Sequence, residues 1–272
     1  MTRLRRNLPA VLGVFCVYAA LAIALTWPAA LPGQGIVPGA ERTDVYNSLW
    51  SLWWFQDAIW RGDVPYLTRL LDHPDGGTLL VADLPAAFWG LVLVPALGLP
   101  GAYTALAIGR LALGGAAAHG LAQDWLGDAR AAWVAGVAFE TAPVVLSGVH
   151  NGTSEAFAVA PVALVAWAAL RLSRGGGWAR ILELGAALLL AALASWYAAV
   201  VGFLFAFAML ALGRGAQTWT RRLAGLALGL VLVLPWAVAS HSAATGPDNL
   251  VGIKHARELG GVRRTTGAAD PR

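Results

Sequence analysis

Long apolar stretches recur along almost the whole chain, and they constrain its fold more than any other feature. Hydrophobic residues make up 58% of the 272 residues and charged residues only 12%, whereas a soluble domain carries roughly 25% charged residues. A soluble domain with one membrane anchor would confine its apolar residues to that anchor. We therefore predict an all-α fold, a polytopic bundle of transmembrane helices. The apolar stretches cover residues 9–28, 86–98, 102–122, 130–148, 156–172, 179–194, 197–213 and 220–239.

The first stretch follows a basic start, as a secretory signal peptide would. Its apolar run from Pro9 to Trp27 is longer than the roughly 7–15 residues of a signal peptide's apolar core. It is long enough to cross a bilayer, which takes about 20 residues. We therefore interpret it as an uncleaved first helix.

Clusters of arginine predict which loops face the cytoplasm. They occur before residue 9, at 171–180 and at 214–222, and short cytoplasmic loops are rich in basic residues. Any two cytoplasmic points must be separated by an even number of crossings, yet an odd number of apolar stretches lies between the first two clusters. The short segment 86–98 covers only about 20 Å of a hydrocarbon core about 30 Å thick. We expect it to be a re-entrant or interfacial helix on the outer side.

About seven crossings then remain in a transmembrane region covering residues 1–240. The long first loop, residues 29–101, lies on the outer side together with the loop 148–155. The polar tail 241–272 also lies outside, and we expect it to be truncated or disordered.

Charge and cysteine content exclude two other classes of site. The net charge is only +4, and the basic residues lie in short runs between apolar stretches, which is not the basic patch of a nucleic-acid-binding protein. Cys16 is the single cysteine, so neither an intramolecular disulfide nor a cysteine-based metal site can form.

The segment 47–60 predicts a helix lying in the membrane surface. It reads NSLWSLWWFQDAIW, and amphipathic helices rich in tryptophan lie in the membrane interface. Such a helix would hold Asp44, which precedes it, at the membrane–water boundary, where a lipid-linked phosphate presents its head group. The broad apolar face consists of Leu49, Trp50, Trp53, Trp54, Ile59 and Trp60.

Two further outer segments carry residues that suit a metal or a phosphate. The run Asp72-His73-Pro74-Asp75-Gly76 combines carboxylates with an imidazole, although the same residue types are typical of a β-turn. The loop 148–155 carries His150 and Glu155. Glu155 either begins the next helix, where the helix dipole stabilises an acid, or joins Asp44 in holding one divalent cation through oxygen ligands. Both interpretations remain open.

Arg110 and Glu140 lie inside predicted crossings. Charges inside a membrane are costly and usually paired. Each lies eight positions from the outer end of its predicted helix, which places both about 12 Å below the same surface. We therefore predict a buried salt bridge between them.

Residues 9–240 resemble the N-terminal part of the GT-C superfamily of membrane glycosyltransferases. That superfamily includes the protein O-mannosyltransferases, the catalytic subunits of oligosaccharyltransferases and many bacterial relatives. The order of several short motifs carries the resemblance. They are Thr43-Asp44 followed by SLWSLWWF, the turn Asp72-His73-Pro74-Asp75-Gly76, the stretch from Gly127 to Thr141-Ala142-Pro143, and Leu193-Ala194-Ser195-Trp196-Tyr197-Ala198.

The resemblance implies an inverting glycosyltransferase of a bacterial inner membrane, with its N-terminus in the cytoplasm. The sugar would come from a polyprenyl-phosphate-linked donor, and Asp44 would be the catalytic base or metal ligand. Glu155 would supply the second acid, with Mg²⁺ or Mn²⁺ as the cation. His73, His150 and Trp54 are the candidates for substrate contact. Family members usually have more helices, so we expect this chain to be an incomplete fragment.

A second hypothesis is a non-catalytic polytopic membrane protein, either half of a transporter or an assembly partner. Transporters place polar groups and broken helices near the middle of the membrane. In this sequence the acids and the helix breaks lie mostly toward the outer face, which favours chemistry at the surface.

Overall fold

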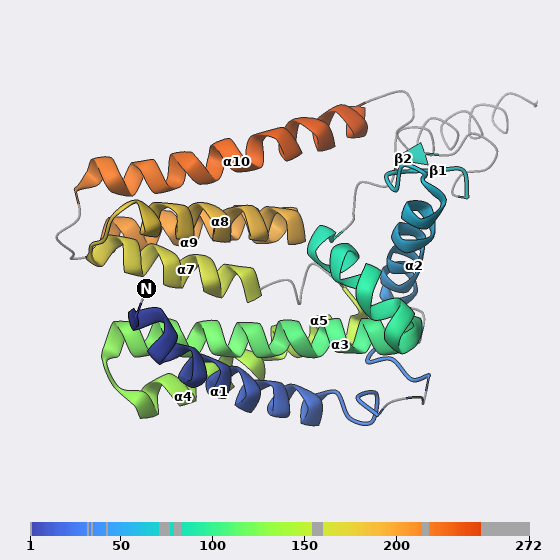
Figure 1. The fold of residues 1–272 in the computed structure, drawn as a ribbon, viewed down its shortest axis with the longest axis horizontal. Helices are drawn as coiled ribbons and strands as arrows, with labels where there is room; N and C mark the ends of the chain where they lie inside the picture. The colour runs from blue at the N-terminus through green and yellow to red at the C-terminus, as the bar shows by residue number, and fades with distance from the viewer. Residues whose placement is uncertain are drawn as a thin grey trace, which may run out of the picture.

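The computed structural model describes residues 2–31, 33, 35–41, 43–70, 77–78, 83–153, 160–213 and 218–245. The predicted all-α helix bundle is confirmed for these residues (Figure 1). A short antiparallel pairing of β1 (Leu67–Thr68) with β2 (Gly77–Thr78) accompanies the helices. The helices are α1 (Thr2–Leu25), α2 (Val45–Arg61), α3 (Leu84–Leu126), α4 (Ala129–Glu140), α5 (Pro143–Asn151), α7 (Ala160–Arg174), α8 (Trp178–Ala194), α9 (Trp196–Leu212) and α10 (Trp219–Thr245).

Local sequence signals set several of the helix ends. Gly62 and Gly127 follow α2 and α3 in the left-handed conformation, which glycine adopts without steric cost. Asp128 caps α4, and its side chain accepts hydrogen bonds from two backbone amides. Ser195 alone separates α8 from α9 and accepts a hydrogen bond from the Tyr197 amide. The predicted break between these two helices is therefore confirmed.

Helix α3 consists of two limbs that meet at Gly98. The backbone there has φ 71° and ψ 169°, a conformation that is essentially restricted to glycine. The first limb, 84–97, corresponds to the short apolar segment 86–98, and Figure 1 shows it inclined to the long second limb. This short apolar segment is thus separated from the rest of α3 by a sharp bend.

The loops fall into two groups at opposite ends of the bundle (Figure 1). The beginning of α1, the α3–α4 and α7–α8 connections and the beginning of α10 lie at one end, which we call the arginine end. Helix α2, the short strands and the beginning of α9 lie at the other, which we call the α2 end. Among the residues that the structure describes, three helical stretches are long and apolar enough to cross a membrane: Leu84–Leu126, Ala129–Asn151 and Trp219–Ser242.

Small residues allow close helix contacts in the core. One buried cluster joins α7, α8 and α9 through alanines together with Leu172, Leu184 and Leu188, and another joins α1, α2, α3 and α5 around Tyr103 and Leu111. Alanine and glycine let helix backbones approach closely in membrane proteins. The second cluster attaches α2 to α1, α3 and α5.

Candidate functional site

The backbone around Asp44 is held against the end of α5. The Ala40 amide donates to the His150 carbonyl at 2.7 Å, and the Asp44 amide donates to the Asn151 carbonyl at 3.1 Å. The Ser48 hydroxyl donates to the Gly152 carbonyl at 3.0 Å. These bonds bring together two of the segments that the sequence predicts to be outer loops with candidate site residues.

Two glycines make this contact between the segments close. Gly39 and Gly152 both have positive φ angles, and a Cβ atom on either would overlap Val45. Val45 is the first residue of α2 and is buried. The beginning of α2, and with it Asp44, is therefore fixed by tight backbone packing.

The carboxylate of Asp44 is exposed. Asp44 occupies the N-cap position of α2, but its side chain makes no capping hydrogen bond. A negative charge at this position is favoured by the helix dipole. The side chain is therefore available to a ligand, because it is not occupied in capping α2.

Of the other candidate site residues, the structure places only some. His150 is exposed in the last turn of α5, beside the Asp44 backbone. Glu155 and His73 lie outside the described residues, so the cation shared by Asp44 and Glu155 stays a prediction. Within the described ranges, no group of three or more histidine, cysteine or acidic side chains is placed to bind a metal.

Trp54 has a packing role in this structure. Its ring is buried with Phe55 and Ala58 against the first limb of α3, and its indole N–H donates to the Pro65 carbonyl at 2.9 Å. The expected single apolar face of α2 therefore divides in two. One face packs against the protein, and the other leaves Tyr46, Trp53 and Trp60 exposed.

The predicted salt bridge between Arg110 and Glu140 is wrong. Arg110 pairs with Asp83, which also caps α3 through the Ala86 amide. The bend at Gly98 brings this acid back to a residue 27 positions further along the chain. No local sequence signal indicates this pairing, because the direction of the first limb depends on the bend.

Glu140 lies at the centre of the contact between α1, α3 and α4. It is fully buried, and neither carboxyl oxygen has a hydrogen-bond partner among the residues that the structure describes. A Cβ atom on Gly115 would lie 2.7 Å from Tyr18 Cδ1 and 2.9 Å from Glu140 Oε2. The Tyr18 hydroxyl in turn lies 3.1 Å from His119 Nδ1. Sequence reasoning missed Tyr18 and His119, although each is a polar group within a strongly apolar stretch.

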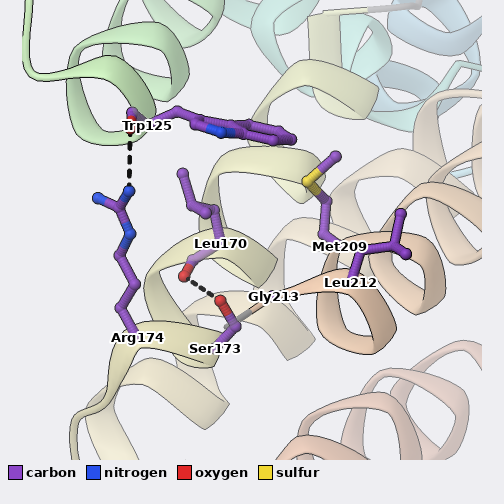
Figure 2. Close-up of a pocket in the computed structure, with 7 residues that line it drawn as sticks. All are labelled: Trp125, Leu170, Ser173, Arg174, Met209, Leu212 and Gly213. Atoms are coloured by element: carbon purple, nitrogen blue, oxygen red, sulfur yellow. Dashed lines mark hydrogen bonds between the residues drawn. The ribbon is translucent and has the colours of Figure 1, made fainter. Parts of the chain in front are cut away.

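A groove of about 380 Å³ lies at the arginine end, between the end of α3 and helices α7 and α9, and Figure 2 shows the residues that line it. Arg174 stands at its edge and donates to the carbonyls of Asp124 and Trp125. These are terminal carbonyls of α3, so Arg174 supplies the partners that a helix end lacks. The lining residues are Trp125, Leu170, Ser173, Arg174, Met209, Leu212 and Gly213.

Comparisons with known proteins do not assign the chain to a family. No protein-family model matches the chain, and no curated protein matches it. The resemblance to the GT-C superfamily therefore rests on the sequence motifs alone.

Proposed function

We propose that the chain belongs to a membrane glycosyltransferase that takes its sugar from a polyprenyl-phosphate-linked donor. The observation that carries the proposal is the exposed carboxylate of Asp44, whose backbone is held beside the last turn of α5, which contains His150. It lies at the end of the bundle that also holds the tryptophan-rich helix α2. A lipid-linked phosphate would present its head group at this level of the membrane.

In this proposal Asp44 acts on the acceptor. As a general base it would remove the proton of an acceptor hydroxyl, whose oxygen attacks C1 of the sugar while the lipid phosphate leaves. Glu155 is the proposed second acid, and His73 and His150 would contact the phosphate. The exposed carboxylate of Asp44 offers the oxygen ligand that Mg²⁺ or Mn²⁺ prefers. Such a cation, when bound, would neutralise charge on the leaving phosphate.

The glycosyltransferase hypothesis also predicts the membrane in which the protein lies and its orientation there. We place the protein in a bacterial inner membrane, with the arginine end in the cytoplasm and the α2 end outside. The arginine-rich loops support this orientation. The sugar acceptor would then approach from the outer side.

A second candidate is a non-catalytic polytopic protein, such as half of a transporter. The specific observation in its favour is the interruption of the stretch Ala129–Asn151 between α4 and α5, with Glu140 buried directly before it. Transporters combine broken helices with buried polar groups. A lipid-binding experiment separates the two candidates, because only the glycosyltransferase hypothesis requires Asp44 to act on a lipid-linked phosphate.

The test uses the full chain in lipid nanodiscs with polyprenyl phosphate and a series of polyprenyl-phosphate-linked hexoses. We expect the chain to bind the lipids in the presence of Mg²⁺ and to release polyprenyl phosphate from the sugar-linked lipids, with water as the acceptor of the sugar. Asp44→Asn keeps the size of the side chain but removes its charge, and loss of a general base should lower the release rate by roughly 10²–10⁴-fold. Glu41→Gln is the matched control, because Glu41 is another exposed acid in the same loop.

Two results would contradict the proposal. If neither the free nor the sugar-linked lipid binds, the glycosyltransferase hypothesis fails for this chain. If Asp44→Asn releases polyprenyl phosphate as fast as Glu41→Gln does, Asp44 has no part in the reaction.

A further inference from the structure

We propose that Glu140 is a proton-binding site, buried between α1, α3 and α4, at which the carboxyl group is held as a neutral acid in the folded bundle. This site is separate from the candidate site at Asp44 and does not depend on the proposed function.

The first argument is the lack of a balancing charge. Glu140 is fully buried, and both of its oxygens lack hydrogen-bond partners among the described residues. The cation expected to pair with it, Arg110, pairs with Asp83 instead. An isolated ionised carboxylate is very costly in an apolar environment, and such a group takes up a proton instead.

The groups that face Glu140 do not supply that charge. Tyr18 of α1 packs against the same glycine of α3, Gly115, as Glu140 does. His119, one turn further along α3, forms a hydrogen bond with the Tyr18 hydroxyl. That hydroxyl also donates to the Trp133 carbonyl of α4 at 3.3 Å. Tyr18 and His119 are the titratable side chains that the described parts of α1 and α3 bring to this position.

The packing selects a proton over a larger ligand. A single methyl group on Gly115 would already approach Glu140 Oε2 to 2.9 Å. On α4, a methyl group on Gly136 would overlap the Tyr18 hydroxyl and lie 2.7 Å from the Gly115 carbonyl oxygen. A metal ion needs several oxygen ligands around it, whereas a proton needs no additional space.

The position of the acid adds a functional argument. Glu140 is the last residue of α4, and α5 begins only at Pro143. Helix breaks inside membrane proteins commonly accompany ion-binding groups, and an ionisable residue inside a membrane span marks a functional site by default. Gain or loss of one proton here would change the charge at the joint between two helical segments.

The infrared spectrum of the purified chain in nanodiscs tests the proposal directly. A neutral carboxyl group has a C=O stretching band that an ionised carboxylate lacks. We expect this band at neutral pH in the wild type and in the control Asp44→Asn, and we expect it to be lost in Glu140→Gln. If the neutral carboxyl band is the same in Glu140→Gln and the wild type, the band does not come from Glu140, and the proposal is overturned.

Thermal unfolding as a function of pH gives a second measurement. The unfolded chain releases the Glu140 proton above pH of about 4.3, while the folded chain retains it. Raising the pH therefore lowers the folding equilibrium constant of the wild type, by up to about tenfold per pH unit. Glu140→Gln lacks this component, whereas Tyr18 and His119 are common to both proteins.

Equal pH dependence in the wild type and Glu140→Gln would contradict the proposal. If Glu140→Gln does not fold, the wild-type spectrum still decides, because the absence of a neutral carboxyl band at neutral pH overturns the assignment.

Discussion

At the scale of single residues, the buried ionisable side chains of this protein fall into two kinds, one with an ionic partner and one without such a partner among the described residues. Arg110 and Asp83, with side chains that are 14% and 9% exposed, form an ion pair. Glu140 is buried without an ionic partner among the described residues. The first arrangement links two limbs of one helix by opposite charges, and the second requires a proton.

The ion pair between Arg110 and Asp83 should contribute strongly to stability. Removing one partner of a buried pair typically costs about 3–5 kcal/mol, because the other charge is left without compensation. We expect Arg110→Met to lower the free energy of unfolding by about this amount. Asp83→Asn, which keeps an acceptor for the Ala86 amide, should do likewise. Combined, the two changes should cost clearly less than their sum, as measured by thermal unfolding in detergent.

An exposed ion pair provides the control. Arg61 and Asp57 lie one turn apart on α2, with side chains that are 51% and 34% exposed. Pairs of this kind contribute only about 0.3–0.5 kcal/mol, so Asp57→Asn should have little effect on unfolding. Equal effects of Asp57→Asn and Asp83→Asn would mean that the buried pair has no special importance.

At the scale of elements, α2 and α3 together build the α2 end. Helix α2 packs Trp54 and Phe55 against Leu84 and Ala87 of α3. The stacked rings of Trp196 and Trp236 lie in the same region, with Tyr66 next to Trp236. Burial raises the pKa of the Tyr66 hydroxyl. The first limb of α3 thus connects α2 to the helices that follow later in the chain.

The bend in α3 should depend on the absence of a side chain at Gly98. A Cβ atom there would meet no other atom within 4 Å, so a substitution tests backbone conformation alone. Residues forced into this glycine-specific region cost about 1–3 kcal/mol. We therefore expect Gly98→Ala to lower the melting temperature.

Gly109→Ala is the matched control, because it lies in the same helix and its Cβ atom would also be free of contacts within 4 Å. Alanine is favoured over glycine inside a helix by about 0.5–1 kcal/mol, so the control should raise the melting temperature. A stabilising effect of Gly98→Ala would show that the bend is not required.

At the scale of the whole molecule, the two ends of the bundle differ in chemistry. The arginine end carries Arg171 and Arg180, both paired with Glu183, and Arg174, which caps α3. The α2 end carries the exposed acid Asp44, while exposed tryptophans occur at both ends, such as Trp60 on α2 and Trp178 at the start of α8. Such an asymmetry is typical of a membrane protein with a fixed orientation.

Cysteine labelling tests this orientation. In a Cys16→Ser background, we expect a membrane-impermeant thiol reagent added from outside to label both Ser51→Cys, on α2, and Thr153→Cys, after α5. Gly177→Cys, between α7 and α8 at the arginine end, should be protected. Labelling of Ser51→Cys with protection of Thr153→Cys would mean that segment 86–98 crosses the membrane and that the number of crossings is not seven.

The sequence by itself determined which segments are helical and, within a few residues, where most of them end. These properties are local: apolar runs form the helices, and residues such as Gly62, Gly127, Asp128 and Ser195 end or begin them. One exception is the break between α4 and α5, which interrupts the predicted continuous segment 130–148. Another is α10, which continues to Thr245 instead of ending near 239.

Only the tertiary structure decided which side chains meet. The rise of about 1.5 Å per residue let the sequence place Arg110 and Glu140 at a similar depth, but depth leaves the rotation and tilt of each helix undefined. The bend at Gly98 brings Asp83 close enough to form an ion pair with Arg110. The packing of α3 against α2 buries the Trp54 ring. Asp44 was recognisable as a candidate because its position depends on the adjacent helix. Its contact with the end of α5 joins residues more than a hundred positions apart, and that contact arises only when the bundle folds.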